Sequence, residues 1–262
     1  MDLGIEGRAC VVTGASRGIG RATARLLAAD GASVLLVGRS EQSLAEAADD
    51  CGERGATLTI DLRDPDAGDR VVAECLRRFG RIDALVNNAG VIHVAPIDEL
   101  TDADWQEQWE IHVMAPMRLM RAAAPRMAEA GWGRIVNVAS SSGKRPSQRN
   151  AAYSVTKAAE LSLSRTFADA WAAKGVAINA VAPGLTATGM WLEPGGLADQ
   201  EAARQGIDRD EVIAGLGGRS PRGTVATDEE IAAVVAFLCS ERTANVVGAA
   251  WSVDGGSVPT IV

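Results

Sequence analysis

The sequence holds a single tyrosine, Tyr153, and one of its three lysines, Lys157, follows four residues later. In a helix this spacing places both side chains on one face. A free phenol has a pKa of about 10 and is a poor acid or base at neutral pH, whereas a nearby ammonium stabilises the phenolate and lowers that pKa. The pair is therefore a candidate proton-transfer site. The alternative is an ordinary tyrosine at the start of an interface helix.

Ser140 lies thirteen residues before Tyr153 and directly after an apolar segment, residues 135–139, that is typical of a strand. A hydroxyl at the carboxyl end of a parallel strand faces the crevice where such sheets bind ligands. It could donate a hydrogen bond to a carbonyl oxygen, which polarises and orients the carbonyl. Ser141 and Ser142 compete for this role, and the spacing favours Ser140. A serine hydrolase is disfavoured, because no Gly-x-Ser-x-Gly turn surrounds Ser140 and neither histidine has a triad context.

A glycine-rich string, TGASRGIG at residues 13–20, lies between an apolar segment and a helical one. Glycines permit a tight turn, and the start of the following helix presents free N–H groups and a positive dipole end to a pyrophosphate. We expect these residues of the string to contact a dinucleotide: Gly14, Ser16, Arg17, Gly18, Ile19 and Gly20. The alternative is a strand-to-helix turn that binds nothing.

The second apolar segment ends in VGRS, without the Asp or Glu that would bind the ribose 2′-hydroxyl of NAD. Arg39 and Arg17 could instead hold a 2′-phosphate, because guanidinium matches phosphate oxygens. We therefore expect NADP(H), with Arg39 and Ser40 beside the adenosine, in preference to NAD(H). Asp61 and Leu62 follow the third apolar segment and could hold the adenine edge. Asp61 could equally be a turn or helix-cap carboxylate.

Strand-like and helical segments alternate along the whole chain. The expected strands are residues 9–13, 33–37, 57–60, 82–86, 134–138, 177–182 and 249–253. The expected helices are residues 21–29, 41–50, 65–79, 101–130, 151–174 and 228–239. Pro116 and Pro125 fall inside the fourth helix and should bend or break it.

Alternating strands and helices predict right-handed βαβ units and a parallel sheet. The strands are continuous apolar runs, as expected for a sheet covered on both faces. The predicted fold is thus α/β: a three-layer, doubly wound Rossmann sheet that forms a single domain over residues 1–262. Residues 185–227 form a long irregular stretch rich in glycine and proline, which we expect to be a substrate loop or lid.

Composition and charge exclude several classes of protein. The chain is 47% hydrophobic and 23% charged, as in ordinary globular proteins, and its net charge is −8. An acidic surface disfavours nucleic acid and anionic lipid, and no apolar run reaches the roughly 18–20 residues of a membrane span. No signal peptide is visible, and the four cysteines lie far apart, as in a reducing compartment. We expect a cytoplasmic protein with a small-molecule substrate and no metal.

Together these motifs resemble the short-chain dehydrogenase/reductase family along essentially the whole chain. The motifs are residues 13–20, Asn87-Asn88-Ala89-Gly90, Ser140, Tyr153-x-x-x-Lys157, Pro183-Gly184 and Val253-Asp254-Gly255-Gly256. The resemblance implies that Tyr153 is the general acid–base, that Ser140 orients the carbonyl, and that Lys157 lowers the tyrosine pKa and binds the nicotinamide ribose.

The resemblance also implies further cofactor contacts and an assembly. It places these residues along the cofactor: Asn88, Ala89, Gly90, Pro183, Gly184, Thr186 and Thr188. It implies a seven-stranded sheet and a homotetramer or dimer. In the tetramer, helices within residues 105–130 and 151–174 pack on their symmetry mates.

The chain departs from the family at His112, where most members have an asparagine. In the family that asparagine helps to hold a helix kink and a water that relays protons to the lysine. Imidazole can also form hydrogen bonds, although it is larger and titrates near pH 6.5. Our hypothesis is that His112 keeps the relay. The alternative is a histidine packed in the helix.

The resemblance implies an NADP(H)-dependent oxidoreductase that interconverts a ketone or aldehyde and an alcohol. A 3-oxoacyl-thioester reductase of fatty-acid or polyketide synthesis is an alternative. It would need a basic patch for an acidic carrier protein, to which Lys144, Arg145 and Lys174 could contribute. A non-catalytic dinucleotide-binding sensor or scaffold is an alternative of another class.

Overall fold

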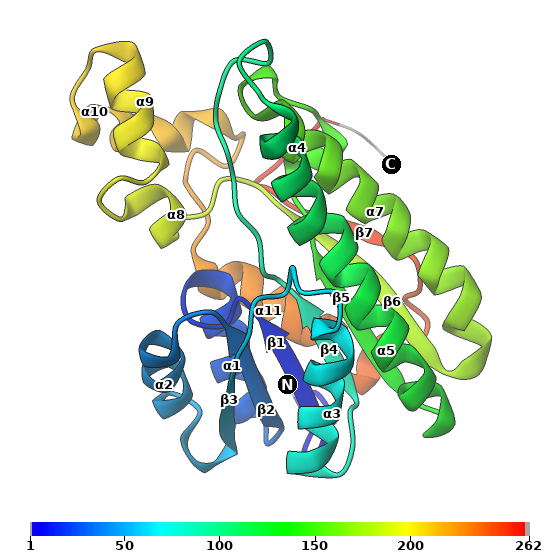
Figure 1. The fold of residues 1–262 in the computed structure, drawn as a ribbon. Coiled ribbons are helices and arrows are strands. Elements are labelled where there is room, and N and C mark those ends of the chain that lie inside the picture. The colour runs from blue at the N-terminus through cyan, green and yellow to red at the C-terminus, as the bar shows by residue number, and fades with distance from the viewer. Residues whose placement is uncertain (1, 260–262) are drawn as a thin grey trace.

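A seven-stranded parallel sheet forms the centre of the computed structural model, which describes residues 2–259 (Figure 1). The strands are β1 (Ala9–Thr13), β2 (Ser33–Gly38), β3 (Gly55–Thr59), β4 (Ala84–Asn87), β5 (Gly133–Val138), β6 (Val176–Pro183) and β7 (Ala250–Val253). Their order is β3-β2-β1-β4-β5-β6-β7, so the chain changes its direction of winding between β1 and β4. At such a switch point a crevice opens at the carboxyl ends of the strands. The predicted doubly wound fold is confirmed.

Helices cover both faces of the sheet, which gives three layers (Figure 1). One face is covered by α1 (Gly18–Ala29), α2 (Glu41–Asp49) and α11 (Asp228–Leu238). The other is covered by α3 (Ala67–Phe79), α5 (Ala115–Glu129) and α7 (Ala151–Trp171). Short 3-10 turns at Gly52–Arg54, Gln148–Asn150, Ala172–Lys174, Gly217–Arg219 and Glu241–Thr243 connect some of these elements. No helix within residues 2–259 is long and apolar enough to cross a membrane.

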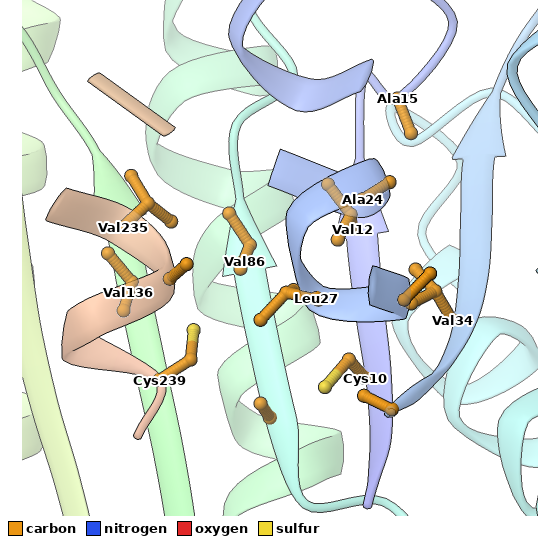
Figure 2. Close-up of a cluster of buried hydrophobic side chains, with 14 of the residues drawn as sticks. Cys10, Val12, Ala15, Ala24, Leu27, Val34, Val86, Val136, Val235 and Cys239 are labelled. Atoms are coloured by element: carbon orange, nitrogen blue, oxygen red, sulfur yellow. The ribbon is translucent and has the colours of Figure 1, made fainter. Parts of the chain in front are cut away.

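Successive residues of each strand pack into opposite helical layers. Figure 2 shows Cys10 and Val12 of β1 packed with Leu27 of α1, and Val235 of α11 over the neighbouring strands. Val11, between them in sequence, packs instead with the α3 and α5 layer. Both layers are built from small aliphatic side chains, so helices and sheet approach closely and hold the strand ends at fixed positions.

The helix expected over residues 101–130 begins as predicted and is interrupted just before Pro116. Thr101 caps α4 (Asp102–Trp109) in a reciprocal capping box with Asp104. The chain then forms a π-helical turn, Glu110–Met114, before α5 begins. Pro116 explains the break, because it has no N–H to donate to the carbonyl four residues earlier. Of the bend or break expected at Pro125, a break does not occur, since α5 continues through this residue to Glu129.

Two further expectations need correction. The third helix begins at Ala67, because Pro65 belongs to a preceding turn and Asp66 occupies the cap position. The stretch 185–227 is not irregular: it forms α8 (Gly189–Leu192), α9 (Leu197–Gln205) and α10 (Arg209–Leu216), which Figure 1 shows together at one end of the molecule. Residues Ala198, Ala202, Val212 and Leu216 give these short helices a small apolar core of their own.

Candidate active site

A cleft of about 370 Å³ lies at the carboxyl ends of the central strands and collects most of the predicted site residues. Those that line it are Gly14, Ser16, Arg17, Gly18, Ile19, Arg39, Asp61, Leu62, Asn88, Ala89, Gly90, Ser140, Tyr153, Lys157, Pro183, Gly184, Thr186 and Thr188. Gly20, Ser40 and His112 do not line it and lie behind or beside it. The residues predicted for the two ends of the site thus line one cleft.

The glycine-rich turn is tied to the end of β4 by hydrogen bonds. The Thr13 hydroxyl donates to the Val86 carbonyl at 3.2 Å and accepts from the backbone N–H groups of Asn88 and Ala89 at 2.9 and 3.1 Å. The Asn88 amide donates to the Thr13 and Gly14 carbonyls at 2.9 and 3.2 Å. These bonds hold the ends of β1 and β4 together at the switch point. The glycine-rich turn and the Asn88-Ala89 segment therefore support each other at this place.

Two glycines of this turn have no room for a side chain. A Cβ on Gly20 would lie 2.3 Å from the Gly14 carbonyl oxygen and 2.5 Å from the Asn88 side-chain nitrogen. Gly14 itself has φ +62°, a conformation that L side chains rarely adopt. Arg17 is the cap residue of α1 and provides no side-chain cap, so the first N–H groups of the helix face the cleft. Such a cradle fits a pyrophosphate.

At the end of the cleft predicted to bind the adenosine, Arg39 lines the wall after β2. Three other residues predicted for this end, Asp61, Arg17 and Ser40, have partners within the protein. Arg63 binds Asp61 at 2.6 Å and holds the pKa of that carboxyl at about 2. Arg17 forms an ion pair with Glu193, which follows α8. Ser40 caps α2 through a bond from the Ser43 N–H. Arg39 is therefore the predicted phosphate ligand best placed to meet a 2′-phosphate.

At the other end of the cleft, Ser140 begins the short helix α6 (Ser141–Lys144). Its hydroxyl oxygen accepts from the Ser142 backbone N–H at 3.1 Å. The hydroxyl hydrogen therefore remains available to a carbonyl in the cleft. Ser141 and Ser142, the competing serines, also line the cleft, but Ser140 is the one held by this cap.

Tyr153 and Lys157 lie one turn apart on α7, with the lysine Nζ 5.7 Å from the centre of the tyrosine ring. Nζ donates to the Val138 carbonyl at 2.9 Å and to Glu160 Oε2 at 2.8 Å. Burial works against the charged lysine, yet the Glu160 carboxylate and Tyr153 together offset it, so the pKa of Lys157 is raised. The ammonium is thus kept charged beside Tyr153.

His112 lies in the π-turn and packs edge-on against the Tyr153 ring, with centroids 5.2 Å apart. The Val91 N–H donates to its Nε2 at 3.2 Å, and its Nδ1 lies 3.0 Å from the Thr156 hydroxyl. Because a backbone N–H can only donate, the ring is neutral with its proton on Nδ1. Burial and the nearby Lys157 charge hold the pKa of His112 well below its ordinary value. Both ring nitrogens have protein partners, so the proton relay stays a prediction.

The sequence analysis missed Glu160 and Thr156. Each lies three residues beyond a predicted catalytic residue, Lys157 and Tyr153 respectively, and so shares its helical face. That spacing was a signal available in the sequence. Within residues 2–259 no group of three His, Cys, Asp or Glu side chains is arranged to hold a metal ion.

The geometry fits a dinucleotide that enters with its pyrophosphate at the glycine turn and its reactive end between Ser140 and Tyr153. The comparisons with known proteins agree with this arrangement. A model of the short chain dehydrogenase family matches residues 8–194. The chain is 38% identical to cis-4-hydroxycyclohexanecarboxylate dehydrogenase of Sinomonas cyclohexanicum over 95% of this chain and 96% of that protein. It is 33% identical to 3-oxoacyl-acyl-carrier-protein reductase of Escherichia coli over 97% and 98%.

Solved structures of reductases are also similar to this chain. L-sorbose reductase of Gluconobacter frateurii, in complex with NADPH and L-sorbose, matches with a TM-score of 0.93 and 37% identity, covering 100% of both chains. A 3-oxoacyl-acyl-carrier-protein reductase of Agrobacterium tumefaciens with NADP bound matches with a TM-score of 0.86 and 30% identity, covering 97% of this chain and 96% of that chain. The protein therefore belongs to the short-chain dehydrogenase family.

Proposed function

We propose that the protein is an NADP(H)-dependent oxidoreductase that interconverts a small ketone or aldehyde and the corresponding alcohol. The observation that carries the proposal is the meeting of Ser140, Tyr153 and Lys157 at one end of a cleft whose other end is the glycine turn. The first group handles a carbonyl and its proton, and the second binds phosphate. A sensor that only binds the cofactor would have no need of the first.

The bound cofactor supplies the hydride in reduction and accepts it in oxidation. In reduction, Ser140 donates a hydrogen bond to the substrate carbonyl and orients it, and the Tyr153 hydroxyl gives its proton to the carbonyl oxygen. Lys157 stabilises the tyrosinate that remains. In oxidation the tyrosinate takes the hydroxyl proton of the alcohol. Lys157 would also bind the nicotinamide ribose, and Thr186 and Thr188 would line the nicotinamide end of the cleft.

NADP(H) is preferred in this proposal because β2 is followed by Arg39 and by no carboxylate. A guanidinium at that position stabilises a 2′-phosphate, whereas an acidic residue would bind the free 2′-hydroxyl of NAD. The solved complexes of L-sorbose reductase with NADPH and of the Agrobacterium reductase with NADP support this choice.

A small substrate is favoured over a carrier protein, because two basic residues near the cleft, Lys144 and Arg149, already have partners within the protein. Lys144 donates to the Ala250 carbonyl at 2.6 Å and to the Ser252 hydroxyl. Arg149 is paired with Glu201 at 2.7 Å. Hydroxylated ketones are the first substrates to test, since relatives act on sorbose and on a hydroxycyclohexanecarboxylate.

We further propose a homotetramer that works in the cytoplasm. Trp109 on α4 and Val155 on α7 are 40% and 47% exposed, so each leaves apolar surface open to solvent. They lie on the two helices that the family resemblance places at subunit contacts. Size-exclusion chromatography with light scattering tests this assembly, and a monomer at all concentrations would contradict it.

The decisive experiment follows NADPH absorbance in the presence of keto-sugars, cyclic keto acids and 3-oxoacyl thioesters. We expect turnover with at least one hydroxylated ketone, a preference for NADPH over NADH, and no turnover by Tyr153→Phe. Tyr153→Phe should still bind NADPH. Tight NADPH binding by the wild type without turnover in either direction would support the sensor instead.

A further inference from the structure

A buried carboxylate touches the proposed catalytic lysine. Glu160 lies one turn beyond Lys157 on α7, and their side chains are 2% and 4% exposed. The Lys157 Nζ donates to Glu160 Oε2 at 2.8 Å and to the Val138 carbonyl of β5 at 2.9 Å. Acidic side chains are almost never buried this completely unless they are paired. The mechanism proposed above uses the lysine charge and gives Glu160 no part.

The pair changes the charge that Tyr153 experiences. An isolated ammonium would favour the tyrosinate strongly, but a carboxylate 2.8 Å from Nζ opposes much of that effect. We propose that Glu160 is a positioning residue that holds Lys157 in place, partly neutralises its charge and thereby sets the pH at which Tyr153 gives up its proton. The proposal rests on the proposed function for its biological meaning, although its chemistry concerns only this chain.

Among the groups around Lys157, we assign the compensation of its charge to Glu160. Within residues 2–259, the other titratable groups that interact with the pair are Tyr153 on the same helix and His112 on the π-turn. His112 is held neutral by burial and by Lys157, so it does not offset the lysine charge. Burial raises the pKa of Glu160, while Lys157 acts to lower it. Val138 contributes a neutral carbonyl. Glu160 is thus the group that carries the compensating charge.

The consequence for proton transfer has a definite sign. While Lys157 stays protonated, loss of the carboxylate lets the ammonium stabilise the tyrosinate more, so the tyrosinate forms at lower pH. Loss of the Lys157 proton, which the Glu160 carboxylate acts to retain, would have the opposite sign. Removing a unit charge roughly 6–12 Å away, at an effective dielectric near 20, shifts a titration by about one to two pH units. With Glu160 present, Tyr153 keeps its proton to higher pH, and carbonyl reduction needs the protonated form.

The test uses the fact that Tyr153 is the sole tyrosine of the chain. A pH titration of tyrosinate absorbance in the near ultraviolet therefore reports this residue alone. It uses the full-length protein without cofactor or substrate, and Tyr153→Phe serves as the blank. We expect the titration of Glu160→Gln to move to lower pH by about one to two units. Glu160→Asp, which keeps the charge, should stay close to the wild type.

A role only in packing would lower stability without moving the titration. An unchanged midpoint in Glu160→Gln, or a shift to higher pH, overturns the proposal. If Glu160→Gln does not fold, as judged by circular dichroism, Glu160→Leu carries the same expectation. In a Lys157→Gln background the effect of Glu160→Gln should shrink, because burial without the lysine raises the pKa of Glu160 further and the carboxyl carries less charge.

The titration needs no substrate, so it separates this inference from the proposed function. Once a substrate is found, the high-pH limb of the reduction profile should move in the same direction in Glu160→Gln. A shifted titration together with no turnover on any carbonyl would support the pairing and contradict the proposed enzyme.

Discussion

His112 Nδ1 lies 3.0 Å from the hydroxyl oxygen of Thr156, and that hydroxyl donates to the Tyr153 carbonyl at 3.0 Å. With the bond from the Val91 N–H to Nε2, one imidazole joins the loop after β4, the π-turn and the first turn of α7. These are the segments that place Tyr153 against the cleft. His112 therefore holds the geometry of the site through two hydrogen bonds, and the one that Nε2 accepts from the Val91 N–H needs the neutral ring.

The first prediction concerns acid stability. Burial and the Lys157 charge hold the pKa of His112 well below 6.5, so the unfolded chain binds a proton near pH 6.5 that the folded protein does not. The free energy of unfolding should fall as the pH drops below about 6.5, by at most ~1.4 kcal/mol per pH unit from this residue. His112→Asn removes the effect. Urea unfolding at several pH values measures the slopes.

The matched control is the other histidine, His93, whose side chain is 46% exposed. His93→Asn should keep the slope of the wild type, and equal slopes in His112→Asn and the wild type would contradict the assignment. The pH–rate profiles of His112→Asn and His112→Ala test the relay hypothesis separately. If His112→Ala left both rate and profile unchanged, the relay role would be wrong.

The second prediction is that Ser140→Ala lowers kcat by about 10²–10³-fold, the usual cost of removing one preorganised donor to a reacting oxygen. Ser142→Ala is the control, because Ser142 contributes a backbone N–H to the Ser140 cap and that N–H survives the change. Ser140→Thr keeps a hydroxyl and should recover part of the rate. A loss of kcat in Ser142→Ala as large as in Ser140→Ala would contradict the assignment of this role to Ser140.

The third prediction is that Arg39→Ala weakens NADPH binding and hardly changes NADH binding. A charge-assisted hydrogen bond is worth about 1.5–3 kcal/mol, so the Kd for NADPH should rise about 10- to 100-fold. Fluorescence titration with each cofactor measures the difference. Arg25→Ala is the control, since Arg25 pairs with Glu229 outside the cleft. Equal losses for NADPH and NADH would show that Arg39 does not read the 2′-phosphate.

The fourth prediction concerns the glycine turn. Gly20→Ala forces a Cβ to within 2.3 Å of the Gly14 carbonyl oxygen, so it should cost ~1–3 kcal/mol of stability and weaken NADPH binding. Gly215→Ala in α10 is the control, because its Cβ would meet no atom within 4 Å. Thermal unfolding and NADPH titration of both variants check the prediction. A Gly20→Ala protein with unchanged stability and binding would refute this description of the turn.

The sequence predicted the fold well where local signals and packing agree. The strand at residues 9–13 has the same limits in the structure, because four apolar residues and Thr13 are followed by Gly14, whose positive φ is typical of a turn. Tyr153 and Lys157 were found because both residue types are rare in this chain. The helices at 197–205 and 209–216 were missed, because short polar helices stabilised by their own small core carry little periodicity.

The electrostatics of the site could not be read in the same way. A lysine and a glutamate three residues apart are usually a surface pair, and only the three-dimensional packing shows that Glu160 is buried beside Lys157. His112 was recognised as a departure, but its bonds to Val91 and Thr156 join segments far apart in sequence. Such contacts depend on the fold rather than on local spacing.

The reactivity of the four cysteines of the core can report local unfolding of the protein. All four are free and buried, and burial raises the pKa of Cys51 to about 11 and those of Cys75 and Cys239 to about 12. Cys10 and Cys239 lie under α1 and α11, whereas Cys75 lies in the α3 layer. A thiol reagent can therefore modify each cysteine only when its helical layer separates from the sheet. The modification rates of the cysteines report the local opening of the two sides of the molecule separately.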